Sequence, residues 1–252
     1  MKIYEIIEKL DALFPDSLRE PWDSDGKMLV LDGEKEVTSV LTTLDVTDGA
    51  VEEAVRLGTN LIVSHHPMIF KAITHLDGTP LSKRIERLIK ADISVISYHT
   101  RFDSAEGGMN DRLAEKLGIK SPRPFGEIGM GRIGEWEECS PSVFAKTVCK
   151  ILDTDVILYE GERRIKKVAV LGGGGKDFIH TAHTLGADAF VTGDVSYSVA
   201  NEELPYGITI VDAGHFATER IAVDAFAEII EEMGVTAHRF REKDTKKFIT
   251  KE

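Results

Sequence analysis

The chain has 252 residues, 42% hydrophobic and 29% charged, a composition typical of a globular protein that buries a core without disulfides. Its 31 Lys and Arg residues against 43 Asp and Glu give a net charge of −12, which argues against nucleic-acid or anionic-membrane binding. Two cysteines exclude a Cys-rich metal site, and the sequence has no apolar run of the roughly 20 residues that a membrane span needs. The acidic start also lacks a signal-peptide core, so we expect a cytoplasmic protein without a membrane partner.

Strands and helices alternate along the first half of the chain. Apolar residues at helical spacing predict a helix from Ile3 to Leu13, which Pro15 ends. The segment 21–26 has the composition of a loop. Further strands are predicted at 37–46, 61–63 and 93–96, and further helices at 48–57, 82–91 and 110–117.

The pattern changes after Pro122 and Pro124, where a glycine-rich segment at 128–136 shows no helical period. Beyond it we predict helices at 141–152, 178–185 and 217–233, and strands at 156–159, 168–171, 189–191 and 208–211. Residues 239–252 are interpreted as a strand followed by a solvated tail. This alternation predicts an α/β fold with mostly parallel sheets, divided into a first lobe at 1–124 and a second at 125–252.

Three clusters of chemically active residues each follow a predicted strand, the place where ligands bind in open α/β sheets. The first is Ser64-His65-His66-Pro67, which alone is also compatible with a surface or core histidine pair. The second contains His99 and Asp103, where a carboxylate also suits a helix cap. The third contains His215 and Glu219, which share one helix face; its alternative is an acid that complements the helix dipole.

Taken together, the clusters supply three imidazoles and two carboxylates as candidate metal ligands: His65, His66, Asp103, His215 and Glu219. A single catalytic ion needs about three protein ligands, so five ligands with one bridging carboxylate suit two divalent ions. The nitrogen and oxygen donors favour Zn, Mn, Fe or Co over Ca.

Two weaker signals lie in the second half. Gly172 to Lys176 connects a strand to a helix, but the Walker pattern of phosphate-binding loops is absent. We favour a tight turn that lines the site over a phosphate contact. His180 and His183 are three apart on a helix and are interpreted as surface residues.

The motifs resemble, in order along nearly the whole chain, those of the NIF-three-like dinuclear metal-centre family, whose members are commonly named GTP cyclohydrolase 1 type 2 homologs. The matching segments are Trp22-Asp23-x-x-Gly26, Ser64-His65-His66-Pro67, His99-Thr100-x-x-Asp103, Gly107-Gly108-x-Asn110-Asp111, Gly172-Gly173 and Asp212-Ala213-Gly214-His215-x-x-Thr218-Glu219. Ser24, Arg101 and Asp194 depart from the family's usual residues, and none of them is a predicted ligand.

The resemblance implies two interlinked α/β lobes with a two-metal site in the cleft between them, and no mid-chain insert. It implies the same five ligands, with His99 beside them as a supporting or catalytic residue. It also implies a toroidal homohexamer.

The leading functional hypothesis is a metal-dependent hydrolase that opens the purine ring of a nucleotide such as GTP, with His99 or Glu219 moving protons. A metal-binding scaffold or metallochaperone without turnover is one alternative. A metal-dependent nucleotide phosphoesterase is another.

Overall fold

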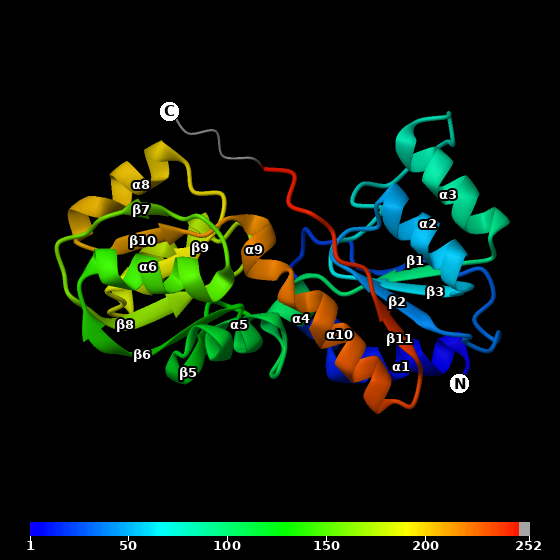
Figure 1. The fold of residues 1–252 in the computed structure, drawn as a ribbon, viewed down its shortest axis with the longest axis horizontal. Helices are drawn as coiled ribbons and strands as arrows, with labels where there is room; N and C mark the ends of the chain where they lie inside the picture. Colours follow the sequence, from blue (N-terminus) through cyan, green and yellow to red (C-terminus); the bar gives the residue numbers. More distant parts are fainter. Residues whose placement is uncertain (247–252) are drawn as a thin grey trace.

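Two β-sheets form the framework of the chain, of which the computed structural model describes residues 1–246 (Figure 1). The strands of the first sheet are, in spatial order, β1 (Gly26–Leu29), β4 (Ser94–Ser97), β3 (Leu61–Ser64), β2 (Val40–Thr43) and β11 (Ala237–Arg239). Those of the second sheet are β5 (Lys120–Phe125), β6 (Gly131–Cys139), β8 (Ile165–Val170), β9 (Ala189–Thr192), β10 (Thr209–Asp212) and β7 (Ile157–Tyr159).

Strand directions differ between the two sheets. In the first sheet β4, β3, β2 and β11 run parallel, and only β1 is antiparallel to its neighbour within the described residues. In the second sheet β8, β9 and β10 are parallel, whereas β5, β6 and β7 join antiparallel. The α/β class is therefore confirmed, but the second sheet is mixed rather than mostly parallel.

Helices cover the faces of both sheets (Figure 1). The α-helices are α1 (Ile3–Leu13), α2 (Asp48–Leu57), α3 (Pro80–Lys90), α4 (Thr100–Ser104), α5 (Met109–Leu117), α6 (Pro141–Leu152), α7 (Ile179–Thr184), α8 (Tyr197–Glu203), α9 (His215–Glu219) and α10 (Ile221–Glu232). Their ends follow capping rules. Thr47 accepts a hydrogen bond from the Ala50 amide at the start of α2, and Gly58 ends that helix in the left-handed conformation.

The largest apolar core is shared by the two sheets. It joins residues of α1, α5 and α10 to Val63 and Ile96 of the first sheet and to Val170 and Val211 of the second. Smaller cores lie on the opposite faces, under α2 and α3 in the first sheet and under α7 in the second. Because β11 returns the chain to the first sheet after α10, the two halves are linked twice. The lobe boundary at residue 124 stays a prediction; β5 spans that position.

Several elements were not predicted from the sequence. β5 contains Pro122 and Pro124 and is largely exposed at the sheet edge, which is where proline is tolerated in a strand. β1, β6, α4 and α8 were also missed, because they are short or rich in glycine and polar residues. The helix expected at 217–233 is divided at Arg220 into α9 and α10.

The C-terminal strand, β11, begins before the predicted tail, and residues 247–252 of that tail lie outside the described residues. Between residues 1 and 246, no helix is both long and apolar enough to cross a bilayer.

Candidate metal centre

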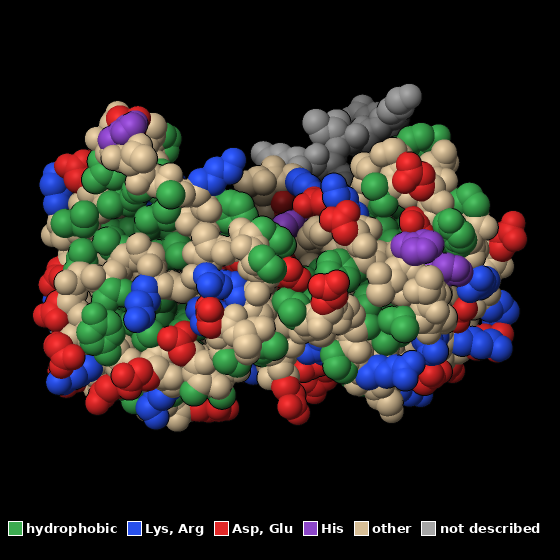
Figure 2. Space-filling model, turned by 180° about the vertical axis from the view of Figure 1, so that it is seen from behind, with side chains coloured by type: hydrophobic (Ala, Val, Ile, Leu, Met, Phe, Trp, Pro, Cys, Tyr) green, Lys and Arg blue, Asp and Glu red, His purple; other side chains and the backbone are tan. Residues whose placement is uncertain are grey.

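The carboxyl ends of strands from both sheets meet at one site. β3 ends directly before His65, and β4 ends before the turn that leads to His99 and α4. From the second sheet, β10 ends before Gly214, and α9 then presents His215 and Glu219 one turn apart. Figure 2 shows a histidine surface in the recess between the two halves of the molecule.

His66 and His215 are each oriented by a carboxylate. The Nδ1 of His66 donates to Asp45 Oδ1 at 2.9 Å, and the Nδ1 of His215 donates to Asp194 Oδ2 at 2.8 Å. Because a carboxylate accepts only, each Nδ1 carries the hydrogen, and the Nε2 of each neutral ring presents its lone pair to the site. Such carboxylate–histidine pairs are typical of metal ligands and their supporting residues.

His65 and His99 are also held through Nδ1, His65 by a backbone oxygen and His99 by a carboxylate. The Nδ1 of His65 donates to the backbone oxygen of Tyr98 at 3.0 Å, and the Nδ1 of His99 donates to Asp23 Oδ1 at 3.0 Å. The ring of His99 lies 5.2 Å from that of His65 and 5.5 Å from that of His66, centre to centre. All four imidazoles are therefore held through Nδ1, which leaves Nε2 as the nitrogen that can coordinate an ion or bond within the site.

Glu219 lies between the histidines and is 3% exposed. Its Oε2 is 3.0 Å from His66 Nε2 and 2.9 Å from His215 Nε2, and these two nitrogens are 3.4 Å apart. Its Oε1 faces the other way, 3.8 Å from His65 Nε2. Two nitrogen lone pairs and a carboxylate cannot approach so closely without a positive charge among them, supplied by a proton or a metal ion.

Asp103 completes the arrangement on the His65 side. Its Oδ1 is 3.5 Å from His65 Nε2, and both atoms are buried without a hydrogen-bond partner among the described residues. Unpaired buried polar atoms are rare because each costs about 1–3 kcal/mol. A divalent cation would satisfy both atoms, so the residues present fit a metal.

The charged groups of the site shift one another's pKa values. Burial alone would lower the pKa of His66, but hydrogen bonds to Asp45 and Glu219 outweigh burial and raise it to about 10. Burial would also lower the pKa of His215, but Glu219 and Asp194 outweigh burial and raise it to about 9. Burial raises the pKa of Asp103 to about 6. Burial would also raise the pKa of Glu219, but the surrounding histidines hold it well below its ordinary value.

The glycine-rich turn after β8 supports Glu219. Gly173 has φ +67°, and a Cβ there would collide with Glu219 Oε1, so this position requires glycine. The amides of Gly172 and Gly173 donate to Asn110 Oδ1 at 2.8 Å and to Thr218 Oγ1 at 2.9 Å. The turn thus lines the site, and these amides are used within the protein rather than free for a phosphate.

Arg101 has a structural position. It is 4% exposed, its Nε contacts Asp25 Oδ1 at 3.1 Å, and its Nη1 contacts Asp11 Oδ1 at 3.0 Å and the backbone oxygen of Phe14 at 3.2 Å. The guanidinium therefore joins α4 to α1 and to the loop before β1. His180 and His183 lie on α7 against Tyr206, outside this cluster.

The C-terminal segment supports the site from outside, which the sequence did not indicate. Glu242 Oε1 accepts hydrogen bonds from Thr43 Oγ1 and from the amides of Leu44 and Asp45, 3.1 and 3.0 Å away. This fixes the turn that carries Asp45, the partner of His66. Farther along, Lys246 Nζ contacts Asp194 Oδ1 at 3.1 Å.

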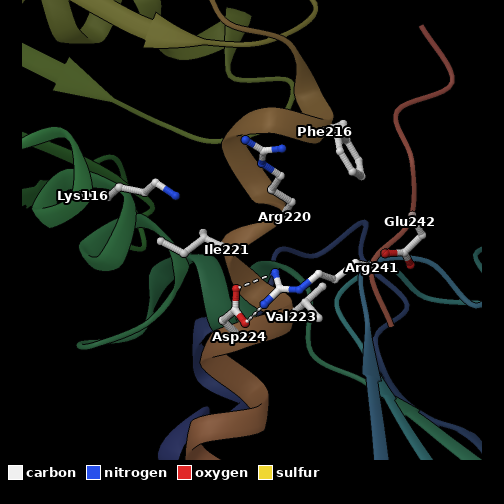
Figure 3. Close-up of a pocket in the computed structure, with 8 residues that line it drawn as sticks. All are labelled: Lys116, Phe216, Arg220, Ile221, Val223, Asp224, Arg241 and Glu242. Carbon is white, nitrogen blue, oxygen red and sulfur yellow. Dashed lines mark hydrogen bonds and ion pairs between the residues drawn. The ribbon is translucent and has the colours of Figure 1, made fainter. Parts of the chain in front are cut away.

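A cavity of about 270 Å³ lies between this segment, α9 and the start of α10 (Figure 3). Arg241 pairs with Asp224 of α10 through two hydrogen bonds of 3.0 and 2.7 Å, while Glu242 turns toward the strand ends. The segment is therefore held against both the site and α10.

The structure brings together all five predicted ligands and places His99 beside them. The sequence interpretation missed the supporting carboxylates Asp45 and Glu242. It included Asp23 only within a family motif and Asp194 only as a departure from the family's usual residues. Asp45 and Asp194 had the same signal as the ligands, since each follows a buried strand, β2 or β9. Glu242 had no comparable signal, because its contacts are almost 200 residues away in the sequence.

The fold is α/β, and imidazoles and carboxylates from both sheets converge on one site. The protein is therefore a candidate metal-binding protein. The sequence matches the family model Duf34/NIF3 (NGG1p interacting factor 3) over residues 1–246, and the chain belongs to that family.

Named relatives and solved structures agree with the family assignment. A Clostridium perfringens protein named GTP cyclohydrolase 1 type 2 homolog is 36% identical over 243 residues, covering 92% of each chain. A Lactococcus lactis protein of the same name is 32% identical, covering 96% of this chain and 97% of that relative. The structure of a Staphylococcus aureus hypothetical protein superposes with a TM-score of 0.92 at 28% identity over 99% of each chain. The structure of a Bacillus cereus protein related to NIF3 superposes with a TM-score of 0.88 at 26% identity over 99% of each chain.

Proposed function

We propose that the protein is a hydrolase that depends on two divalent metal ions. The observation that carries the proposal is the position of Glu219, whose Oε2 faces the Nε2 atoms of His66 and His215 and whose Oε1 faces His65 Nε2. A carboxylate in this position can bridge two ions, as in the two-metal sites of many hydrolases.

The ligands divide into two groups around this carboxylate. His66 and His215 share Oε2 of Glu219, whereas His65 and Asp103 lie on the side of Oε1. Each group offers nitrogen and oxygen donors without a thiolate, which suits Zn, Mn, Fe or Co. Asp45 and Asp194 hold the first pair of rings in place and increase their basicity.

Bound divalent ions would lower the pKa of a water molecule and polarise the bond that the water attacks. Around them, His99 is placed to transfer the proton. Burial would lower the pKa of His99, but Asp23 and Asp103 outweigh burial and raise it. Asp23 fixes the Nδ1 hydrogen, so Nε2 exchanges the proton. Glu219 was the other predicted proton carrier, but its oxygens already face the ligand histidines, and we assign it as a ligand.

For the substrate we propose a purine nucleotide. The support is the name that the relatives carry, GTP cyclohydrolase 1 type 2 homolog. In that chemistry one water adds to C8 of guanine and the ring opens, and a second water releases C8 as formate. The test is to incubate metal-loaded protein with GTP and measure formate and the ring-opened product by mass spectrometry. Metal-dependent formate release that is lost in Glu219→Gln supports the proposal; no product from protein with two bound ions contradicts it.

Metal transfer without turnover is the second candidate. The side chain of His215 is 37% exposed, so an ion held by it is accessible to a partner protein. Rapid transfer of the ion to an apo-metalloprotein, with GTP left intact, would favour this function over hydrolysis.

A further inference from the structure

Two exposed aromatic side chains stand beside the histidine cluster without a role in the proposed chemistry. Trp22 is 58% exposed and Phe70 is 48% exposed, although large aromatic side chains are usually buried. Their ring centres are 6.2 Å apart, and the Trp22 ring is 5.8 Å from the ring of His99. The rings of Trp22 and Phe70 therefore form one continuous surface with the histidine cluster at the edge of the site.

The turn that carries Trp22 is anchored to Thr100, at the start of α4, by the residues on either side of the tryptophan. The next residue, Asp23, orients His99 and accepts hydrogen bonds from the Thr100 amide at 3.0 Å and from Thr100 Oγ1 at 2.6 Å. The Glu20 amide donates to the same hydroxyl at 3.0 Å. The turn that carries Trp22 is thus attached to the start of α4, while the indole remains 58% exposed.

The loop that carries Phe70 is joined to the same turn. Ser24 Oγ donates to the backbone oxygen of Ile69 at 3.1 Å, which places the two aromatic residues on neighbouring, linked segments. Phe70 follows the strand end that carries His65 and His66 by only a few residues. Both rings therefore approach the candidate ligands from one side.

We propose that Trp22 and Phe70 form a stacking surface for a planar heteroaromatic ring, which holds the base of a nucleotide against the metal centre. This rests on the proposed function and names the substrate group that the site recognises. Every nucleobase has a π-face that stacks on such side chains, and the polar edge of the base would then face His99 and the ligands beyond it. A sugar phosphate without a base offers nothing for this surface to bind.

The test compares GMP with ribose 5-phosphate, which has the same sugar and phosphate without the base. Binding to the metal-loaded protein is measured by calorimetry. Trp22→Ala is expected to weaken GMP binding about tenfold and to leave ribose 5-phosphate unchanged, because stacking on one aromatic ring contributes roughly this much. Trp22→Phe keeps a ring and is expected to restore most of the affinity. Tyr197→Ala removes another exposed aromatic residue, on α8, and is expected to change neither ligand.

A second readout uses fluorescence. The chain has two tryptophans. The other one, Trp136 of β6, packs edge-on against Phe144 of α6 with 5.0 Å between the ring centres. In Trp136→Phe the emission comes from Trp22 alone, and GMP is expected to quench it while ribose 5-phosphate does not.

The outcomes separate this inference from the proposed function. GMP binding that depends on Trp22, without formate release from GTP, supports the stacking surface and contradicts the hydrolase. Formate release with equal GMP affinity in wild type and Trp22→Ala contradicts the stacking surface and leaves the hydrolase intact. An oligomer that dissociates in Trp22→Ala while GMP affinity is unchanged also contradicts the stacking surface and makes Trp22 an interface residue.

Discussion

Replacing Asp45 by Asn tests whether the carboxylates behind the histidines contribute to metal binding. The substitution keeps the size of the side chain and removes its charge from the 2.9 Å contact with His66 Nδ1. Supporting residues of this kind are worth roughly 10- to 100-fold in metal affinity. Because the Asp45 side chain is 50% exposed, solvent screens part of its effect, and we expect about a tenfold loss, equal to about 1.4 kcal/mol.

The assay is a titration of Zn²⁺ against a chromophoric chelator, with metal content measured in parallel. Only the ion on the His66 side should weaken, because Asp45 does not contact His65 or Asp103. Asp48→Asn is the matched control; this carboxylate is three residues farther along and pairs with Arg84 on the surface. Affinity equal to wild type in Asp45→Asn, or the same loss in Asp48→Asn, would refute the assignment of His66 as an oriented ligand.

Three further predictions concern the same site. Asp103→Ala removes the carboxylate that faces His65 Nε2, so elemental analysis should show loss of one ion per chain together with turnover, and activity that survives this loss contradicts the mechanism. Since the pKa of His66 is about 10 and that of His215 about 9 before an ion binds, metal uptake must displace protons. Apparent affinity should rise by about tenfold or more per pH unit between about pH 6.5 and 8.5, as measured by calorimetry in buffers of different ionisation enthalpy, and a flat profile would exclude proton release. Gly173→Ala places a methyl group against Glu219 at φ +67°, so both metal affinity and the melting temperature should fall, whereas Gly174→Ala, in open space, should change neither strongly.

The assembly stays a prediction from the family resemblance, which implies a toroidal homohexamer. Light scattering coupled to gel filtration measures it directly. A mass of six chains supports the prediction, and a stable monomer would contradict it.

Much of the site was predictable because its residues follow buried strands. His65, His66, Asp103, His215 and Glu219 come from three apolar segments that each end at a polar cluster, and parallel strands within a sheet bring such ends to one edge. That the edges of two different sheets meet at the site was not encoded in this pattern. The same rule applies to Asp45 and Asp194, but a lone acid after a strand is usually a cap or a solvated residue. Their role became visible only when the contacts to His66 and His215 were known.

The features that the sequence did not predict depend on contacts that local patterns do not encode. Glu242 reaches the end of β2 from the opposite end of the chain, and neither segment indicates its partner. The edge strand β5 contains two prolines, and its pairing with β6 determines its conformation more than its own propensity does. The return of β11 to the first sheet, where it pairs with β2, is a long-range contact that neither segment indicates by its own sequence.

We propose that this chain holds two metal ions bridged by Glu219. The most direct test is a crystal structure of metal-loaded protein with anomalous scattering recorded at the absorption edge of the bound metal. We expect two anomalous peaks per chain, one beside His66 and His215 and one beside His65 and Asp103, with Glu219 between them. A single peak, or ions bound away from these residues, would contradict it.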